Sequence, residues 1–422
     1  MAQTYKFGNG TWATKKGSTL AYSDTNNAFK PLPFSFERNS IATRVNKEGL
    51  IEVVGNDIPR IDYTDSAEGA LLLENSATNL ITYSEDFSNA FWLIQNASVT
   101  LNNSISPNGT LSATKLIENT SNSTHRILNS AGLTVSGDVS MSIFAKKGER
   151  NWIRLTNNNI QGAFFDLENG IIGDVSSGFD AKIQSYGNGW YRCSISQLGV
   201  ANERIGVYIS TDGINTSYQG NGTSGVYIYG ASLEQGNLSS YIPTNGSTVQ
   251  RAAETCNESG NSEVFNSQEG VLFLDTKALS NDGTTRTIGL SDGSNSNRIH
   301  FINYAVANGY SVNYRVSNST QVAFTKIGNV LDYQKIAFKY KSGDFSLWYN
   351  GFEIDTDSNT NMMADGVLNT LSFRQEPNTL PFYGKTREIG YYDEILTDAE
   401  LETLTSYRSL NEMVTELNLN AL

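Results

Sequence analysis

Only two histidines, His125 and His300, could serve general acid–base chemistry near neutral pH, where histidine is the side chain most often used. His125 follows a run of Asn, Ser and Thr that is typical of a turn, and His300 lies in a predicted strand. We therefore interpret both as ordinary structural residues and predict no catalytic residue. The 43 acidic residues leave a carboxylate pair for glycoside hydrolysis open, because their separation in space is invisible in the sequence.

Metal-ligating residue types occur in one suggestive register, residues 355–361, which places oxygen side chains at positions 1, 3, 5 and 7 of a calcium loop. The most demanding positions do not fit, because Thr360 replaces the glycine of such a loop and Gly366 replaces its bidentate glutamate. Cys193 and Cys256 stand alone, without the Cys/His spacing of a zinc site. The sequence therefore predicts a solvated turn at 355–361, two buried thiols, no metal and no cofactor.

Aromatic side chains form the most specific pattern for binding. In the predicted strands between residues 151 and 229, aliphatic residues occupy one face, while the other face carries Trp152, Arg154, Tyr208, Tyr227 and Tyr229. Rings on a solvent-facing sheet can stack on the apolar faces of sugars, and polar side chains can bind the hydroxyl groups. Packing against a loop, another domain or a second copy would produce the same pattern and is the commoner use of such a patch. Trp348, in a later strand, raises the same two alternatives.

Composition narrows the function classes. The 422-residue chain has a net charge of −13 and a pI near 4.7, which argues against a nucleic-acid partner because phosphate binding needs clustered Lys and Arg. No stretch approaches the ~20 apolar residues of a membrane span. Residues 1–12 lack the basic and apolar regions of an export signal. We expect a soluble protein that is made without a classical export signal and has no membrane span.

Alternating apolarity predicts an all-β protein with several successive blocks. Residues 1–85 carry only brief apolar runs and are predicted to be irregular. Strand-rich blocks follow at 86–256 and from 268 onward, separated by a linker. Thr397 and Glu400 fit a capping box, so a short C-terminal helix is expected, with an interruption around Leu410 and a helical tail over 406–422.

Several strings resemble a family of tailed-bacteriophage virion proteins with head spike, head fibre or tail fibre modules. They include Ser35-Phe36-Glu37-Arg38-Asn39-Ser40, Ile58-Pro59-Arg60-Ile61-Asp62-Tyr63, Tyr83-Ser84-Glu85-Asp86-Phe87-Ser88, Trp190-Tyr191-Arg192 and Ser240-Tyr241-Ile242-Pro243-Thr244. The resemblance covers residues 35–254. It implies a carbohydrate-binding-module-like jelly roll over 86–256 and an N-terminal segment, 1–85, that attaches to the particle.

A second resemblance covers residues 268–405, which are similar to concanavalin-like and laminin-G-like sandwiches. It is carried by Phe345-Ser346-Leu347-Trp348-Tyr349-Asn350-Gly351 and by Leu396-Thr397-Asp398-Ala399-Glu400-Leu401. The Asn350-Gly351 pair also suits a type I′ hairpin turn, because both central residues of that turn need a positive φ. The expected fold is thus two β-sandwiches, a jelly roll followed by a concanavalin/laminin-G-like domain.

Together these observations predict a non-enzymatic structural virion protein, a head or tail fibre or spike subunit displayed on a phage particle and binding host-surface or environmental glycans. The expected partners are other virion proteins, met through residues 1–85, and further copies of the chain in a trimer. The proposed glycan-binding residues are Trp152, Arg154, Tyr208, Tyr227, Tyr229 and Trp348. A polysaccharide lyase or glycosidase on a concanavalin-like scaffold stays open as the alternative, and a cell-surface adhesin is disfavoured by the missing export signal.

Overall fold

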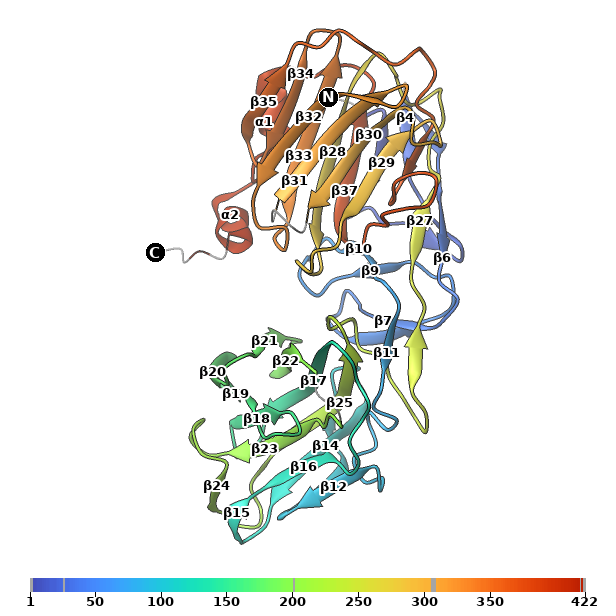
Figure 1. The fold of residues 1–422 in the computed structure, drawn as a ribbon. Helices are drawn as coiled ribbons and strands as arrows, with labels where there is room; N and C mark the ends of the chain where they lie inside the picture. Colours follow the sequence, from blue (N-terminus) through green and yellow to red (C-terminus); the bar gives the residue numbers. More distant parts are fainter. Residues whose placement is uncertain (1–2, 26, 200–201, 305–308, 418, 420–422) are drawn as a thin grey trace. The chain divides into compact units, whose positions relative to one another are not determined.

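A computed structural model describes residues 3–25, 27–199, 202–304, 309–417 and 419. Two compact units form, and neither is continuous in sequence (Figure 1). The first unit contains residues 1–39, 55–75 and 253–422, and the second contains residues 40–54 and 76–252. About 51% of the residues are strand and 4% helix, which confirms the all-β prediction.

The second unit is a sandwich of two six-stranded antiparallel sheets. We call one the front sheet; its order is β12 (Trp92–Gln95), β16 (Arg126–Asn129), β23 (Gly206–Ser210), β18 (Trp152–Thr156), β19 (Gly162–Asp166) and β20 (Ile171–Val175). The back sheet has the order β13 (Ala97–Ile105), β14 (Leu111–Glu118), β25 (Gly225–Gln235), β17 (Asp138–Lys147), β22 (Trp190–Leu198) and β21 (Asp180–Ser185). Short ribbons complete the unit: β7 (Ala42–Val45) with β8 (Ile51–Val54), β11 (Ala77–Asn79) with β26 (Val249–Arg251), and β15 (Asn122–Thr124) with β24 (Ser217–Gln219).

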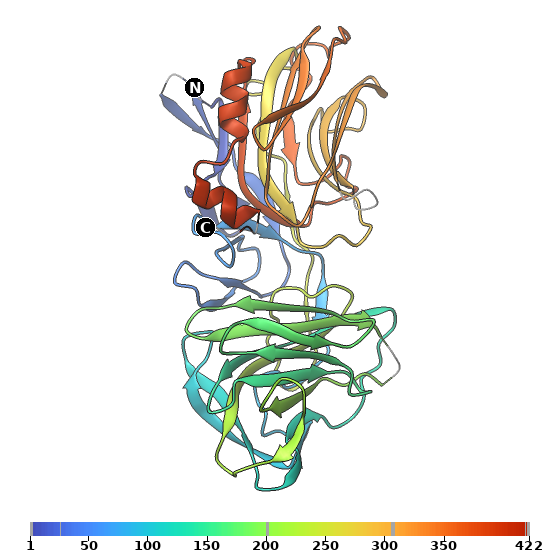
Figure 2. The same cartoon turned by 90° about the vertical axis from the view of Figure 1, so that its left-hand side faces the viewer.

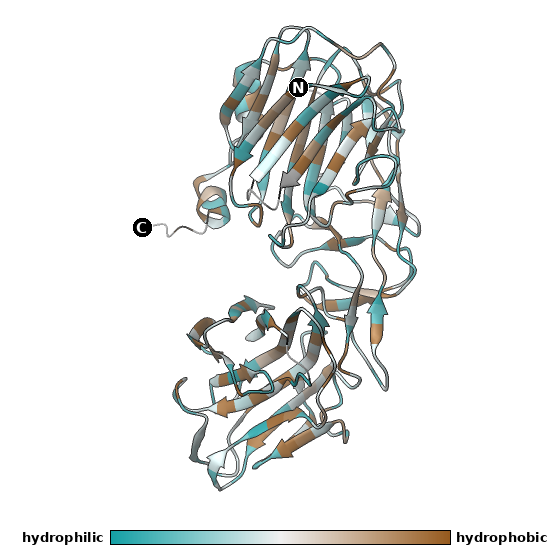
Figure 3. Ribbon diagram, in the orientation of Figure 1, coloured by the Kyte–Doolittle hydropathy of each residue, from teal (hydrophilic) through white to brown (hydrophobic). Residues whose placement is uncertain are grey.

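Alternation along the strands builds the core of this sandwich. Ile153 and Leu155 of the front sheet and Met141 and Ile143 of the back sheet belong to one buried hydrophobic cluster. Successive strand residues point to opposite faces, so their neighbours in sequence face away from this core. Figure 3 shows the resulting change between hydrophobic and hydrophilic residues along the strands, and Figure 2 shows the sheets of the second unit in layers.

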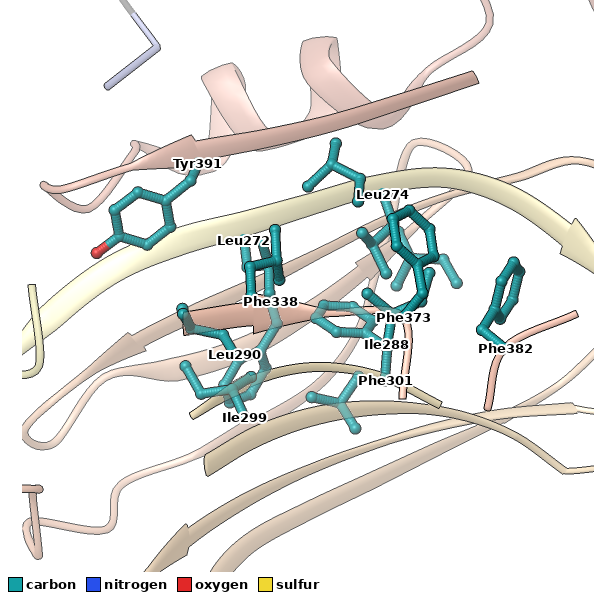
Figure 4. Close-up of a cluster of buried hydrophobic side chains, with 14 of the residues drawn as sticks. Leu272, Leu274, Ile288, Leu290, Ile299, Phe301, Phe338, Phe373, Phe382 and Tyr391 are labelled. Atoms are coloured by element: carbon teal, nitrogen blue, oxygen red, sulfur yellow. The ribbon is translucent and has the colours of Figure 1, made fainter. Parts of the chain in front are cut away.

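Three sheets lie in the described residues of the first unit. The largest has ten strands: β35 (Phe352–Asp357), β34 (Phe345–Tyr349), β33 (Gln334–Lys341), β28 (Glu269–Ala278), β37 (Gly384–Tyr392), β1 (Tyr5–Gly8), β4 (Tyr22–Thr25) and β5 (Ala28–Pro31), with β10 (Ala70–Leu73) and β9 (Arg60–Asp62) joined through β37. The five-stranded sheet has the order β32 (Ser319–Ile327), β31 (Gly309–Val316), β30 (Arg298–Tyr304), β29 (Arg286–Ser291) and β36 (Thr370–Ser372). The four-stranded sheet contains β2 (Thr14–Lys15), β3 (Ser18–Thr19), β6 (Phe34–Glu37) and β27 (Thr255–Asn257). Figure 4 shows side chains of the hydrophobic core, among them Leu272, Phe338 and Ile299, which come from β28, β33 and β30.

The N-terminal residues differ from the irregular segment that the sequence predicts. Strand β1 pairs with β37, and Tyr5, Phe7, Phe34 and Phe36 are buried in the core of the first unit. The strands here have two to four residues, too few for alternation to stand out in the sequence. Several of them, such as β1, β6 and β10, pair with strands that lie far along the chain. Residues 1–85 therefore do not form a block of their own but contribute strands to both units.

A buried group of charges holds these distant segments together, and we call it the junction network: Arg38, Arg60, Glu74 and Glu254. Arg38 donates to Glu254 at 2.8 Å, and Arg60 donates to Glu254 at 2.8 Å and to Glu74 at 2.7 Å. The side chains of Arg38, Arg60 and Glu254 have no exposed surface. The attraction of the two carboxylates raises the pKa of Arg60 despite its burial, so the guanidinium stays charged.

Two short helices end the chain, as the capping signal predicts. Helix α1 (Asp398–Thr405) begins after Thr397, whose side chain accepts from the Glu400 amide in a complete capping box. Helix α2 (Leu410–Glu416) begins at the predicted interruption; residues 418 and 420–422 of the predicted tail lie outside the described residues. Leu401 of α1 is buried, whereas α2 buries no residue and is held by ion pairs such as Glu412 with Lys335, at 2.7 Å. Figure 2 shows α1 alongside the ten-stranded sheet.

We expect Glu254→Gln to destabilise the first unit by about 3–5 kcal/mol, because it leaves two buried guanidiniums short of negative charge. Thermal and urea unfolding measure the loss. The matched control is Glu269→Gln, which removes a partly exposed partner of Lys341 and should cost less than about 1 kcal/mol. Equal losses for the two variants would contradict a central role of the junction network.

A pH-dependent contribution is expected from Asp275 on β28. Burial raises its pKa from 3.8 to about 6. The nearby Glu388 and Glu416 also raise this pKa, whereas Arg387 and Lys335 lower it. The folded protein therefore keeps this proton at pH values where the unfolded chain has lost it. The resulting stabilisation is complete below about pH 4 and disappears as the pH rises through 6.

Asp275→Asn should consequently match the natural protein in stability near pH 4 and exceed it at pH 7, by roughly 3 kcal/mol at most. Melting temperatures across this range, with the exposed Asp365→Asn as control, measure the difference. A constant difference across the range would rule out titration of Asp275 as its cause.

Candidate functional site

The outer face of the front sheet brings arginines and aromatic rings into one row across five strands. Cross-strand pairing places Gln95 beside Arg126, Arg126 beside Tyr208, Tyr208 beside Arg154, and Arg154 beside Phe164. We call these five residues the arginine row. Each has neighbours in sequence, such as Ile153 and Leu155, that point into the core, so the row faces away from it.

Each guanidinium of the row lies over an aromatic ring. The Cζ atoms of Arg126 and Arg154 stand 5.0 Å from the ring centroids of Tyr208 and Phe164, respectively. Arg126 also donates to the Oε1 atom of Gln95 at 2.6 Å and to the hydroxyl of Tyr208. Tyr208 and Phe164 are only 2% and 3% exposed, so the two rings orient the guanidiniums and leave no ring face open to a sugar.

The positive charges of the row have no carboxylate partner among the described residues. Arg154 donates to the Ser176 hydroxyl at 3.4 Å, and its buried Nε atom has no hydrogen-bond partner there. Arg150 of the same unit shows the contrast, because it makes two hydrogen bonds to Glu118, at 2.9 and 2.7 Å. Two uncompensated guanidiniums on either side of Tyr208 favour an anion, because a guanidinium binds a carboxylate with two parallel hydrogen bonds.

Trp152 lies on the same face, two residues before Arg154 on β18, and is half-buried. Two glycines pack closely on its indole: a Cβ atom at Gly213 would lie 2.7 Å from the ring and one at Gly173 2.9 Å from it. Gly213 has a φ of +71°, so its loop suits glycine for both conformation and space. The remaining exposed part of the indole can contact a ligand that reaches the arginine row.

The structure separates Tyr227 and Tyr229 from this face, because both lie on β25 of the back sheet. Tyr229 is buried in a small cluster with Phe144 and Tyr241, and its hydroxyl donates to Glu85 at 2.8 Å. Burial and the nearby Glu85 raise its pKa well above the usual value. The alternation assigned each strand face correctly but could not show that two different sheets were involved.

Trp348 lies in the first unit, on β34, and is 6% exposed. It packs with Val271 and Phe273 of β28 and with Leu401 of helix α1. Its indole nitrogen donates to Ser346 at 3.1 Å. Trp348 is therefore a packing residue, as the second alternative predicts, and it is covered by helix α1 of the same chain.

Three members of the arginine row, Gln95, Arg126 and Phe164, are absent from the predicted set. The alternation of Arg126 with the core residue Ile127 is a usable signal for its outward direction. Nothing local in the sequence shows that β16 pairs with β23 and β23 with β18. The row exists only through that register.

Neither histidine pairs with a nucleophile in the part of the chain that the structure describes. His125 has both ring nitrogens within hydrogen-bond distance of backbone carbonyls, at 2.6 and 3.3 Å. Residues 289–293 spell GxSxG, but β29 continues into a turn and β30 rather than a helix, and Ser291 is buried without a bond to a histidine. No group of three or more His, Cys, Asp or Glu residues there could hold a metal, and none of its helices is long and apolar enough to cross a membrane.

The calcium-like register is divided between a strand and a turn. Asp355 and Asp357 lie on β35, and Asp357 and Asn359 accept hydrogen bonds from backbone amides two residues further on, at 2.7 and 2.8 Å. Such bonds are those of ordinary Asx turns.

Comparison with known proteins gives matches among solved structures alone: no family model matches the chain, and no curated protein matches it. One similar structure is the CBM40 of Ruminococcus gnavus IT-sialidase bound to α2,3-sialyllactose, at 18% identity and a TM-score of 0.30, covering 36% of this chain and 94% of that one. Another is domain 4 of AbnA, a GH43 extracellular arabinanase from Geobacillus stearothermophilus, with arabinotriose, at 16% identity and a TM-score of 0.31, covering 41% and 83%. A third is the SAP-like pentraxin of Limulus polyphemus, at 14% identity and a TM-score of 0.27, covering 34% and 73%.

We expect Trp348→Ala to destabilise the first unit by about 3–5 kcal/mol, because it leaves a cavity beneath α1, and to leave glycan retention unchanged. Unfolding curves and glycan-affinity electrophoresis measure the two effects. Phe352→Ala, at a ring that is 72% exposed on β35, is the control and should change neither. Loss of glycan retention by Trp348→Ala at unchanged stability would return this residue to the binding site.

Proposed function

We propose that the outer face of the front sheet binds a glycan that carries an anionic group, such as a uronic or other sugar acid. The observation that carries this proposal is the pair of guanidiniums, Arg126 and Arg154, which flank Tyr208 and form no ion pair among the described residues.

Preorganisation supports this assignment. A long arginine side chain loses much rotamer freedom when it binds a ligand, and stacking on a buried ring restricts that freedom in advance. Phe164 and Tyr208 hold the two guanidiniums in this way, and Gln95 restricts Arg126 further through its hydrogen bond. The arginines can therefore offer their donors to a carboxylate at a reduced entropic cost.

The sugar itself requires a second kind of contact. Trp152 offers an indole edge on the same face, and Ser176 offers a hydroxyl beside Arg154. Amphipathic rings contact the apolar faces of sugars, and hydroxyl groups can both donate and accept. In this proposal the face binds the glycan and does not cleave it.

The net charge of −13 affects how such a ligand would be bound. An acidic polysaccharide is repelled by the protein as a whole, so binding depends on the short-range attraction of the arginine row. Exposed charges interact only within about 10 Å at 0.1 M salt. Moderate salt screens the repulsion, whereas high salt weakens the contact with the arginines as well.

The setting that we propose is display on a tailed-phage particle, with the chain as a fibre or spike subunit in a trimer. Its support is the sequence resemblance over residues 35–254. Mass spectrometry of purified particles and light scattering of the purified protein test it: absence from particles together with a monomeric mass would contradict it.

The binding test is the double variant Arg126→Met and Arg154→Met, which keeps the side-chain stems over the rings and removes both charges. Each charge-assisted contact contributes roughly 1.5–3 kcal/mol, so retention of an acidic polysaccharide should fall by more than about tenfold per arginine. Affinity electrophoresis against matched acidic and neutral polysaccharides, at low and high salt, measures this loss. Lys182→Met, at an exposed position of β21, is the charge-matched control.

Two results would overturn the proposal. One is retention of acidic glycans by the double variant as strong as in the natural protein. The other is a preference of the natural protein for neutral glycans that the double variant keeps. A melting temperature equal to that of the Lys182→Met control shows that any loss of binding is not unfolding.

A further inference from the structure

A second unpaired arginine arrangement lies in the first unit, far along the chain from the arginine row. Arg298 on β30 and Arg315 on β31 are direct cross-strand partners in the five-stranded sheet (Figure 1). Their sequence neighbours Ile299 and Tyr314 are fully buried in the core, so both arginines are on the opposite face of the sheet. Like charges at directly opposed positions destabilise an antiparallel pair.

No carboxylate compensates these charges among the described residues. The hydrogen bonds of Arg298 and Arg315 go to the backbone carbonyls of Asn295 and Asn318, at 2.7 and 2.6 Å. The Nε atoms of both arginines are buried without a partner. Burial and the charge of Arg315 lower the pKa of Arg298 to about 10.

His300 adds two further unsatisfied nitrogens to the same face. It follows Arg298 by two residues on β30 and is 0% exposed, and neither Nδ1 nor Nε2 has a hydrogen-bond partner among the described residues. Its cross-strand neighbour is Gly289, where a Cβ atom would lie 2.7 Å from the Cδ2 atom of the ring. The glycine therefore leaves the space that the imidazole occupies.

Other arginines of this unit form ion pairs with carboxylates, in contrast to Arg298 and Arg315. Arg286 on β29 forms an ion pair with Asp282 at 2.8 Å, and Arg374 forms one with Glu376 at 3.0 Å. Buried polar groups are nearly always satisfied in folded proteins. The paired Arg286 also has a buried Nε atom without a partner, so the exception is the missing carboxylate beside two facing guanidiniums, which calls for an anion from outside the chain.

We propose that Arg298 and Arg315 form a binding site for an oxyanion, a carboxylate, sulfate or phosphate group, with His300 beside it on the same sheet face. An oxyanion offers several acceptor lone pairs to the guanidiniums and removes their mutual repulsion. The anion can be a free ion or a substituent of a charged glycan. This site lies in the other unit from the arginine row, so either proposal can fail while the other stands.

The two histidines of the chain give a direct readout, because His300 stands at the proposed site and His125 is in the second unit. Histidine-selective NMR of the full chain is recorded during titration with inorganic phosphate and, separately, with an oligomer of a hexuronic acid. We expect the His300 signals to shift in a saturable manner with at least one probe. His125 directly precedes Arg126 of the arginine row, so its signals report binding at that row and are read separately from those of His300. Phosphate alone as the active probe identifies a free anion, and the uronate oligomer alone identifies a glycan substituent.

Variants separate binding from fold. Arg298→Gln and Arg315→Gln should each weaken binding of the active probe by about tenfold or more. Each should also raise the melting temperature without ligand, since the repulsion is gone, and abolish the rise in melting temperature that the ligand causes in the natural protein. Lys16→Gln, at an exposed position of the same unit, removes the same charge and should change neither property.

Unmoved His300 signals with both probes would overturn the proposal. An equal response of the natural protein and the double variant Arg298→Gln/Arg315→Gln would overturn it as well. If a single variant is unfolded, the other variant and the Lys16→Gln control decide the result by the same NMR titration.

Discussion

Glu254 is the acceptor on which the order of the first unit depends, because the buried guanidiniums of Arg38 and Arg60 both donate to its carboxylate. Charges without exposed surface are costly unless each is paired, so the segments that carry them must meet in one arrangement. Arg38 and Glu74 lie one residue before the positions where the chain leaves the first unit, and Glu254 lies one residue after a return. Arg38 also donates to the carbonyl of Gly55, at the other return. The ends of all three segments of the first unit that border the second unit thus carry, or bond to, a residue of this cluster.

The sequence predicts which residues share the face of one strand, but it does not predict which strands pair. Alternation on single strands correctly predicted that Trp152, Arg154 and Tyr208 share a face, and the capping signal placed the start of α1. It could not show that Tyr229 belongs to the other sheet or that Arg126 completes the row, because both depend on which strands pair. The short N-terminal strands were missed for the same reason, since their partners, such as β37, lie at the far end of the chain.

Charge also acts on two scales here. The chain as a whole is strongly acidic, which argues against nucleic acid and favours solubility. Locally, each unit places two arginines on one sheet face with no carboxylate partner among the described residues: Arg126 and Arg154 on either side of Tyr208, and Arg298 directly opposite Arg315. Aromatic rings support the guanidiniums of Arg126 and Arg154, whereas Arg298 and Arg315 face each other directly. Overall charge therefore gives little information about the ligand of a particular face.

The discontinuous division of the chain has a consequence for how such a protein can change by genetic exchange. The second unit is encoded by two stretches, residues 40–54 and 76–252, with a piece of the first unit between them. A single recombination event between Arg60 and Glu74 would join Arg38 and Arg60 of one parent to Glu74 and Glu254 of the other. Replacement of the second unit therefore requires either a double exchange or parents that share the Arg38, Arg60, Glu74 and Glu254 arrangement.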